Sequence, residues 1–526
     1  MMKTVGERLV EGLADRGVRV VFGIPGVHTV ELYRGLSGSP VRHVTARHEQ
    51  GCAFMADGYA RVTGQPGVAF VITGPGLTNA LTAMAQSRED SVPVLVISGV
   101  NRRDSLGRGL GRLHELPDQG ALVRALCPSR QITDPQDVGP TLDWAFALLT
   151  TGRPGPVHIE VPTDVMPLPC AALPKPAVPA AKALPPAANL TKAAALLNAA
   201  KRPVILAGGG ARGAEDSLLA LAQVLNAPVI QTTNARGMMH GHPLCIPASP
   251  SLLPVRALIA ASDQILAIGT EIGQTDYDMY ADDGMPSLAG MIRIDIDADQ
   301  LARHPAALML QGDAGATMAA LTPQLAQKPA HSTQAASDTR SAARAALADL
   351  SATMPAQLEM VEAIRSALPQ ALIVGDSTQP VYAGNLYYDH DRAGGWFNAA
   401  TGFGALGFGP GAAVGAAVAS PGTPVVCLIG DGGLQFSPGE LRTAVDENLP
   451  ITFLVWNNAA FREIADAMRG ANTEIIGCHP SPLKMAHFAA ACDLPFTAIP
   501  QDPAELHRAL SAPCKGPRLI EVRVTL

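Results

Sequence analysis

The sequence predicts an α/β protein built from three doubly wound domains, each with a parallel sheet. At about 150 residues per domain, a chain of 526 residues is expected to form about three. Short unbroken apolar runs alternate with helix-like segments, which is typical of parallel strands covered on both faces. Two segments are predicted to be linkers between domains. They are residues 166–190, which include seven prolines, and residues 326–345, which are mostly small and polar. They divide the chain into expected domains 1–165, 190–325 and 345–526.

The expected strands and helices alternate within each domain. The strands are 18–22, 68–73 and 92–98 in the first domain, 203–207, 264–269 and 291–296 in the second, and 371–375, 424–430 and 451–456 in the third. A helix is expected over 49–62. Because right-handed crossovers make such strands parallel, their carboxyl ends share one edge, where open α/β sheets bind ligands.

Composition excludes several classes of protein. Hydrophobic residues make up 47% and charged residues 16%, so the chain is not disordered. The net charge of −7 gives no basic excess, and nucleic acid is not an expected partner. No apolar stretch is long enough for a membrane span, and the charged N-terminus lacks the apolar core of a secretory signal. The eight cysteines are scattered without CxxC, which favours reduced thiols and a cytoplasmic protein.

The most informative segment is 425–458, which predicts a strand, a helix and a second strand. The first strand ends in Gly430-Asp431-Gly432-Gly433 and the second in Asn457-Asn458, while Ser437, Pro438 and Glu440 between them fit a capping box. A carboxylate and an amide oxygen suit Mg²⁺. Glycines let a phosphate approach backbone N–H groups. The pattern indicates a diphosphate bridged by Mg²⁺, and the alternative is a tight turn and an ordinary loop.

This combination resembles the thiamine diphosphate signature of the superfamily of acetolactate synthase, benzoylformate decarboxylase and pyruvate decarboxylase. The resemblance implies that Asp431, the side chain of Asn458 and the backbone carbonyl of Ala460 bind the metal. Gly430, Gly432 and Gly433 are the glycines expected to let the diphosphate approach the backbone.

The segment Arg47-His48-Glu49-Gln50, followed by FMADGYARVTG at 54–64, is similar to the first domain of the same superfamily. The turn Phe22–Gly26 upstream agrees with it. The resemblance implies that Glu49 hydrogen-bonds the aminopyrimidine ring of the cofactor and so activates it. The alternative is structural, because the helix dipole favours a glutamate in a first turn.

Two further segments match the superfamily. For the segment Gly402–Gly409, the resemblance implies that Leu406 bends the cofactor and that the carbonyl of Gly404 binds the amino group of the cofactor. A plain glycine-rich loop before a helix at 411–419 is equally consistent with the sequence of this segment. In 375–379, Thr378 and Gln379 would contact the diphosphate, or form an ordinary helix cap. In this superfamily the site lies between two subunits, which implies a dimer or tetramer, with Glu49 and Asp431 from different chains.

Departures from the synthase pattern favour a 2-oxo acid decarboxylase that releases an aldehyde. The stretch after Asn458 lacks the tryptophan of the synthases, and their Phe-Gln-Glu is replaced by Leu113-His114-Glu115. His114 could protonate the decarboxylated product, and His28 is a second candidate. Either histidine could instead be structural. The alternative reaction is an acetolactate-type carboligation, which joins two 2-oxo acids.

The string LHELPDQ at 113–119 and FGIPGVHTVELY at 22–33 look like the branch of 5-guanidino-2-oxopentanoate decarboxylases. Glu115, Asp118 and Glu463 could pair with a cationic substrate tail, or be solvated surface groups. The turn GGGARG at 208–213 supports a different hypothesis, a non-catalytic protein that binds FAD or another nucleotide. Such a turn is weak evidence, because it often serves only tight packing.

Overall fold

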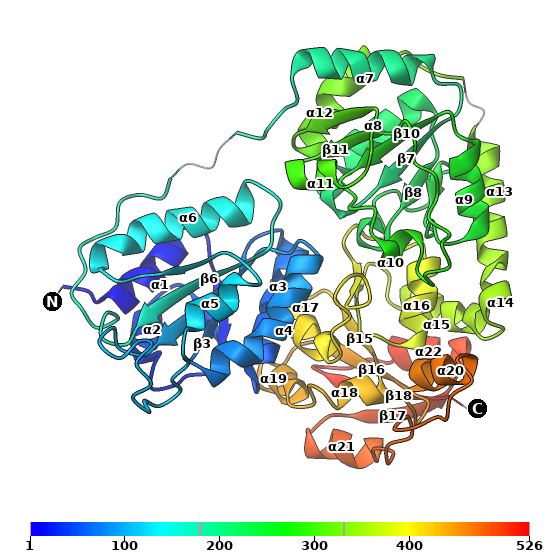
Figure 1. The fold of residues 1–526 in the computed structure, drawn as a ribbon. Coiled ribbons are helices and arrows are strands. Elements are labelled where there is room, and N and C mark those ends of the chain that lie inside the picture. The colour runs from blue at the N-terminus through cyan, green and yellow to red at the C-terminus, as the bar shows by residue number, and fades with distance from the viewer. Residues whose placement is uncertain (1, 178–180, 330–331, 525–526) are drawn as a thin grey trace. The chain divides into compact units, whose positions relative to one another are not determined.

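The computed structural model describes residues 2–177, 181–329 and 332–524. It contains three six-stranded parallel sheets, which confirms the predicted α/β class (Figure 1). The chain divides into two compact units. The first is 1–180, 402–498 and 514–522, and the second is 181–401, 499–513 and 523–526. Residues 178–180 and 330–331 of the predicted linkers lie outside the described residues.

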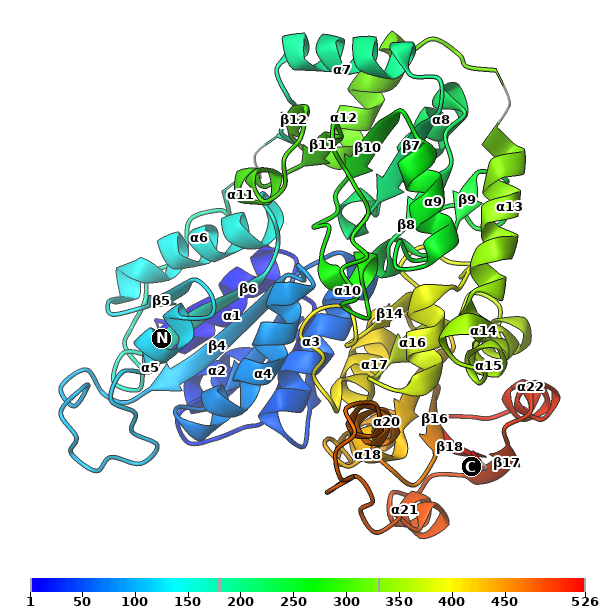
Figure 2. The same cartoon turned by 45° about the vertical axis from the view of Figure 1, so that its right-hand side comes forward.

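The first sheet is formed by residues 20–162. Its strand order is β2 (Arg42–Thr45), β1 (Val20–Gly23), β3 (Gly67–Val71), β4 (Val94–Val100), β6 (Pro156–Pro162) and β5 (Ser129–Gln131). Helices α1 (Val5–Asp15), α2 (Val30–Leu36) and α6 (Val138–Thr150) share one buried apolar core with the strands. Helices α3 (Glu49–Thr63) and α4 (Pro75–Glu89) lie on the other face (Figure 2). The order reverses direction between β1 and β3, the position at which open α/β sheets bind ligands.

The second sheet lies in the middle of the chain. Its order is β12 (Leu308–Gln311), β11 (Ile292–Asp295), β10 (Gln264–Ile268), β7 (Pro203–Ala207), β8 (Val229–Gln231) and β9 (Cys245–Ile246). Helices α7 (Ala187–Ala199), α8 (Glu215–Leu225) and α12 (Ala314–Leu321) contribute to its core. A Cβ on Gly208 would lie 2.3 Å from the carbonyl oxygen of Gly269, and one on Gly210 would lie 2.8 Å from its Cα. Tight packing of two strand ends therefore accounts for these glycines without a ligand.

The third sheet carries the predicted diphosphate motif. Its order is β14 (Trp396–Asn398), β13 (Leu372–Gly375), β15 (Val425–Gly430), β16 (Ile451–Asn457), β18 (Arg518–Arg523) and β17 (Phe496–Pro500). The strands predicted from the sequence are all present with closely similar bounds. Within the described residues, no helix is both long and apolar enough to cross a membrane.

Further helices connect the strands of the three sheets. They are α5 (Gln119–Arg124), α9 (Leu253–Ala261), α10 (Gln274–Tyr277), α11 (Ala298–Ala302), α16 (Gln379–Leu386), α17 (Phe408–Ala419), α18 (Asp431–Leu434), α19 (Glu440–Asp446), α20 (Arg462–Gly470), α21 (Met485–Ala491) and α22 (Pro503–Ser511).

The prediction of a linker over 326–345 is wrong. Residues Ser332–Ala345 form helix α13, and α14 (Leu347–Leu350) and α15 (Met354–Ala367) follow it. The Arg340 guanidinium donates hydrogen bonds to the carbonyls of Pro243 (2.7 Å) and Cys245 (2.8 Å). Alanine and arginine are strong helix formers, so this small, polar composition is compatible with a helix that packs through few apolar contacts. In the first predicted linker, 171–177 and 181–186 form neither helix nor strand.

Helices α3 and α17 pack closely because glycines remove the side chains between them. A Cβ on Gly58 would lie 2.1 Å from the carbonyl oxygen of Ala412, and one on Gly415 would lie 1.9 Å from that of Met55. No other residue fits at either position. The glycines of both motif segments therefore bring the helix that begins with Glu49 against the helix that follows Leu406.

Candidate active site

The candidate residues of the first sheet all follow the carboxyl ends of its strands. His28 follows β1, and Glu49 follows β2 as the first residue of α3. His114 lies in the loop after β4, and Thr73, which the sequence did not single out, follows β3. The parallel topology thus gathers residues from four separate segments at one edge of the sheet, as the sequence predicts.

The carboxylate of Glu49 is fixed by a neighbour that sequence reasoning missed. Its Oε2 accepts a 3.0 Å hydrogen bond from Nδ2 of Asn79 on α4. His48 is the N-cap of α3, and its Nδ1 accepts from the backbone N–H of Gln50 at 3.2 Å. Glu49 is half-buried. A half-buried, oriented carboxylate suits the proton-handling role expected of this residue.

His28 and His114 lie together, although 86 residues separate them in number (114 − 28). Their ring centroids are 5.3 Å apart in an edge-to-face arrangement at 71°. Nδ1 of each ring and Oγ1 of Thr73 are buried and have no hydrogen-bond partner within the described residues. Burial, and then repulsion from a positive charge on the neighbouring His114 ring, lower the pKa of His28. The structure therefore pairs the two predicted histidines and leaves polar atoms for a ligand.

The loop that carries His114 ends at Gln119, the first residue of α5, which is 3% exposed. Oε1 of Gln119 accepts from the N–H of Gly74 at 2.9 Å, and its Nε2 donates to Oε2 of Glu160 at 3.1 Å. Gly74 has φ +64°, and a Cβ there would lie 2.5 Å from the carbonyl oxygen of His114. His114 itself adopts φ +61°. Gln119 and Glu160 also line a pocket of about 360 Å³.

The carboxylates predicted to pair with a cationic substrate tail differ in their surroundings. Glu115 accepts from the backbone N–H groups of Leu110 (3.1 Å) and Arg112 (2.9 Å), and these bonds stabilise its own loop. Asp118 caps α5 through the N–H of Ala121 (2.7 Å). Glu463 is exposed in the first turn of α20. Local roles therefore account for Glu115 and Asp118.

The predicted metal ligands lie at neighbouring strand ends. Gly430 of β15 is in register with Trp456 of β16, so Asp431 and Asn458 follow adjacent strands. Both are buried, at 7% and 8% exposure. Burial raises the pKa of Asp431, while hydrogen bonds from the backbone N–H groups of Asn458, Asp431 and Gly432 oppose that shift. The β-α-β geometry predicted from the sequence is present.

The two asparagines after β16 have different contacts. Nδ2 of Asn457 donates to Oε1 of Glu521 at 2.6 Å, which anchors this strand end. Oδ1 of Asn458 accepts from the N–H of Ala460 at 3.2 Å. Ala459, between Asn458 and Ala460, adopts the left-handed conformation with φ +54°. The described residues contain no cluster of three His, Cys, Asp or Glu side chains suited to a metal. The expected ligand set has only one carboxylate, so it does not require such a cluster.

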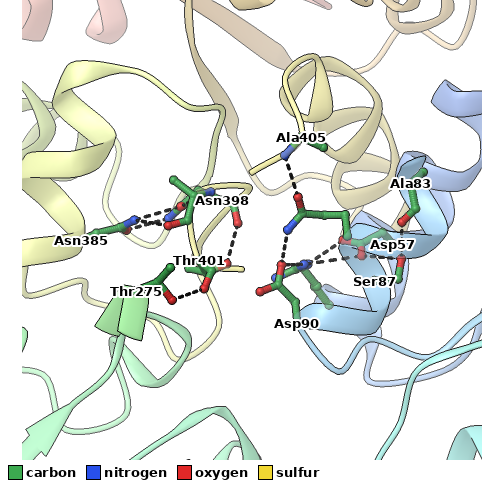
Figure 3. A network of polar contacts seen from close by, with 12 residues as sticks. Asp57, Ala83, Ser87, Asp90, Thr275, Asn385, Asn398, Thr401 and Ala405 are labelled. Atoms are coloured by element: carbon green, nitrogen blue, oxygen red, sulfur yellow. Dashed lines mark hydrogen bonds and ion pairs between the residues drawn. The ribbon is translucent and has the colours of Figure 1, made fainter. Parts of the chain in front are cut away.

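The cofactor loop 402–407 is attached to α4. The N–H of Ala405 donates to Oε1 of Gln86 at 3.1 Å (Figure 3). Gly404 has φ +73° and open space where a Cβ would stand, and Leu406 is half-buried. Gln86, which the sequence did not single out, therefore fixes the backbone between the two residues predicted to contact the cofactor.

The DGYAR motif supplies an ion-pair network behind this loop. Nε of Arg61 lies 2.6 Å from Oδ1 of Asp57, and its NH2 group lies 2.6 Å from Oδ2 of Asp90. Ser87 donates to Asp57 at 2.9 Å, and Nε2 of Gln86 donates to Asp90 at 2.6 Å (Figure 3). Although burial disfavours its charge, the two carboxylates raise the pKa of Arg61, which stays protonated.

Thr378 and Gln379 follow β13, as predicted. Thr378 is the N-cap residue of α16 and is 6% exposed, but within the described structure its side chain makes no capping hydrogen bond. The ordinary helix cap is therefore absent at this position.

The predicted capping box at Ser437 and Glu440 is wrong. Helix α19 begins at Glu440, its N-cap is Gly439, and no side chain caps it within the described residues. Oγ of Ser437 donates instead to the carbonyl of Gly407 at 2.7 Å, beside Leu406. The carboxylate of Glu440 binds backbone of the segment before Glu49. Long-range partners outcompeted the local pattern at both residues.

Three protein-family models match the chain in order. Residues 3–122 match "Thiamine pyrophosphate enzyme, N-terminal TPP binding domain", 190–321 match its "central domain", and 376–522 match its "C-terminal TPP binding domain". The chain belongs to the thiamine pyrophosphate enzymes. This family membership confirms the resemblance noted in the sequence and rules out the non-catalytic nucleotide-binding hypothesis. The TPP-binding domains imply thiamine diphosphate as the cofactor.

Named relatives include one decarboxylase and several acetolactate synthases. "Probable 2-ketoarginine decarboxylase AruI" of Pseudomonas aeruginosa is 42% identical over 99% of this chain and 94% of that protein. "Acetolactate synthase isozyme 1 large subunit" of Escherichia coli is 30% identical, with the same coverage of 99% and 94%. A "Probable acetolactate synthase large subunit" of Methanocaldococcus jannaschii is 30% identical over 86% of this chain and 80% of that protein. This thiamine diphosphate enzyme is thus related to both reaction types.

Proposed function

We propose that this protein is a 2-oxo acid decarboxylase that uses thiamine diphosphate and Mg²⁺, with 5-guanidino-2-oxopentanoate as its substrate. The observation that carries the proposal is the His28–His114 pair, whose buried Nδ1 atoms have no partner among the described residues. Decarboxylation to an aldehyde consumes one proton: the 2-oxo carboxylate and H⁺ give the aldehyde and CO₂. A histidine pair at the sheet edge can deliver that proton.

The donor groups fit the cofactor. We propose that Asp431, Asn458 and the carbonyl of Ala460 bind Mg²⁺, a set of hard oxygen donors. Gly432 and Gly433 would lie at the diphosphate, with Thr378 and Gln379, while Gly404 and Leu406 would contact the rings. A Cβ on Gly432 would lie 2.6 Å from the ring of Phe461, so any side chain here would displace that ring. When bound, the cofactor supplies the group that adds to the 2-oxo carbon and takes up the electrons released with CO₂.

Glu49 is proposed to hydrogen-bond the aminopyrimidine ring, with Asn79 fixing its other oxygen. We also propose that the domains run over 1–165, 190–325 and 345–526, and that the enzyme works in the cytoplasm as a dimer or tetramer. The guanidino substrate is supported by the name of the relative that shares 42% identity. The exposed Glu463, in the helix that follows Ala460, is the carboxylate we assign to the guanidinium tail.

A substrate panel tests the reaction. The protein is incubated with thiamine diphosphate, Mg²⁺ and either 5-guanidino-2-oxopentanoate, pyruvate, 2-oxobutanoate or benzoylformate, and CO₂, aldehyde and acetolactate are measured. We expect CO₂ and 4-guanidinobutanal in equal amounts, with kcat/KM for the guanidino acid at least about 10²-fold above that for pyruvate. Acetolactate from pyruvate without aldehyde from any acid would instead assign the carboligase reaction.

The histidine pair gives a second prediction. His114→Gln is expected to lower kcat for aldehyde release by about 10²-fold, because a glutamine cannot transfer a proton at this site. His28→Asn should have a smaller effect of the same sign. Binding of the cofactor, followed by titration calorimetry, should not change in either variant. His507→Gln, on the exposed face of α22, is the control. Full activity of both pair variants would contradict the assignment.

A further inference from the structure

Glu440 is a buried carboxylate that binds two backbone N–H groups far from it in the chain. It is 1% exposed and begins α19, within the predicted diphosphate segment 425–458. Its oxygens accept from the backbone N–H of Arg47 at 3.1 and 3.2 Å and from that of His48 at 3.1 Å. Oγ1 of Thr443, one turn later, donates to its Oε2 at 2.8 Å. Hydrogen bonds to a buried anion are stronger than those between neutral groups, so these bonds hold the peptides firmly.

The two bound peptides immediately precede Glu49. His48, whose N–H is bound, is also the N-cap of α3, and its ring accepts from the N–H of Gln50 at 3.2 Å. A Cβ on Gly51 would lie 2.1 Å from Oε1 of Glu440, so this carboxylate lies against the first turn of α3. The backbone on both sides of Glu49 is thereby fixed.

The thiol of Cys52 on α3 is subject to the charges of both glutamates. Burial raises the pKa of its thiol, and the charges of Glu440 and Glu49 raise it further. Cys52 is fully buried on α3. Both carboxylates therefore act on one side chain in the first turn of this helix.

We propose that Glu440 is a positioning residue for Glu49: by binding the peptides of Arg47 and His48, it sets the direction in which the Glu49 carboxyl points. The inference rests on the role proposed for Glu49 at the cofactor. A displacement of about 1 Å at a reacting group can cost about 10²-fold in rate. The segment carrying Glu49 would therefore depend on a residue from the diphosphate part of the chain that contacts no substrate.

The chain offers a matched control. Asp446 lies on the same helix as Glu440 and pairs with the same residue, Arg47, but through its guanidinium rather than its backbone. Its side chain is 46% exposed. Asp446→Asn thus removes a carboxylate from the same helix without touching the peptides before Glu49.

The first measurement is made without cofactor. Hydrogen–deuterium exchange with residue-resolved fragmentation is measured for wild type, Glu440→Ala, Glu440→Gln and Asp446→Asn. In Glu440→Ala we expect the amides of Arg47 and His48 to exchange at least about tenfold faster, while amides of β3 stay unchanged. Glu440→Gln should stay within about threefold of wild type, because its amide oxygen can accept from both N–H groups while its NH₂ donates to Thr443. Asp446→Asn should match wild type.

The second measurement separates positioning from simple stability. The exchange of the C2 hydrogen of bound thiamine diphosphate is expected to slow at least about tenfold in Glu440→Ala, with KM for the 2-oxo acid nearly unchanged. If Glu440→Ala does not fold, Thr443→Val, which removes one donor to Glu440, should speed exchange of the same two amides about twofold to threefold.

Two outcomes overturn the proposal. One is unchanged amide exchange at Arg47 and His48 in Glu440→Ala and Thr443→Val. The other is faster amide exchange spread evenly over α3 and β3. A failure of the proposed function is a different result. Unchanged C2 exchange in Glu49→Gln would remove the role of Glu49, while the amide measurement without cofactor would still report whether Glu440 fixes the two peptides.

Discussion

Replacing Glu49 with glutamine is expected to reduce decarboxylation by about 10²–10⁴-fold, the range of a lost acid–base group. Glutamine keeps the size of the side chain and can still accept from Asn79, whose Nδ2 lies 3.0 Å from Oε2 of Glu49. It has no proton to share with the ring nitrogen of the cofactor. The rate is followed as aldehyde released from the guanidino acid, and C2 hydrogen exchange of the bound cofactor is followed by NMR after acid quench.

The control for Glu49→Gln is a glutamate in the same structural position without the proposed role. Glu505 also lies in a first helical turn, in α22, and pairs with Arg508 at 2.7 Å on the exposed surface. Glu505→Gln should leave both rates within about twofold, as expected for a surface pair of small energetic weight. Wild-type C2 exchange in Glu49→Gln would show that another group activates the cofactor.

The part of the site that could be predicted from the sequence depends on topology. Alternating apolar runs predict parallel sheets, and parallel sheets place strand ends at one edge. Asp431 and Asn458 follow strands predicted to be neighbours, and the register of Gly430 with Trp456 confirms that they are. The same reasoning placed Glu49 at the start of a helix, where α3 indeed begins.

The contacts that fix these residues could not be predicted, because their partners are distant in sequence. Ser437 and Glu440 satisfy the local spacing of a capping box, yet their side chains bind Gly407 and the peptides of Arg47 and His48. A local rule describes what a side chain can do within its own turn. It gives no information on a backbone group from a distant segment that competes for the same side chain.

The His28–His114 pair depends on backbone conformations that the sequence does not reveal. His114 adopts φ +61°, which few non-glycine residues do, and its carbonyl oxygen would lie only 2.5 Å from a Cβ on Gly74. A left-handed residue in a long loop can be recognised only once the loop is folded. The sequence could nominate each histidine but could not place the rings 5.3 Å apart.

The DGYAR motif is partly explained by its own spacing and partly by contacts that only the structure shows. Asp57 and Arg61 are spaced i, i+4 in a helix whose neighbouring residues are apolar, which indicates an ion pair. The structure adds Asp90 to the pair and connects it, through Gln86, to the N–H of Ala405 in the cofactor loop. The motif therefore contributes to the site by stabilising the loop that carries Gly404 and Leu406.

Arg61→Met is consequently expected to have a large effect on stability. The side chains of Arg61, Asp57 and Asp90 are 1%, 0% and 2% exposed. Removing the guanidinium leaves two buried carboxylates without their cation, which typically costs about 3–5 kcal/mol. Urea unfolding, followed by tryptophan fluorescence, should show a lower midpoint, and the apparent affinity for thiamine diphosphate should fall because the Ala405 loop loses its support.

Two comparisons test whether the lost charge is the cause. Arg88→Met breaks an exposed pair with Glu89, with the arginine side chain 54% exposed, and should change stability by less than about 0.5 kcal/mol. Adding Asp57→Asn and Asp90→Asn to Arg61→Met removes the unpaired charges, so this triple variant should recover much of the lost stability. A single variant as stable as wild type would mean that the network contributes little. A triple variant less stable than the single one would mean that packing of the Arg61 side chain, rather than its charge, stabilises the loop.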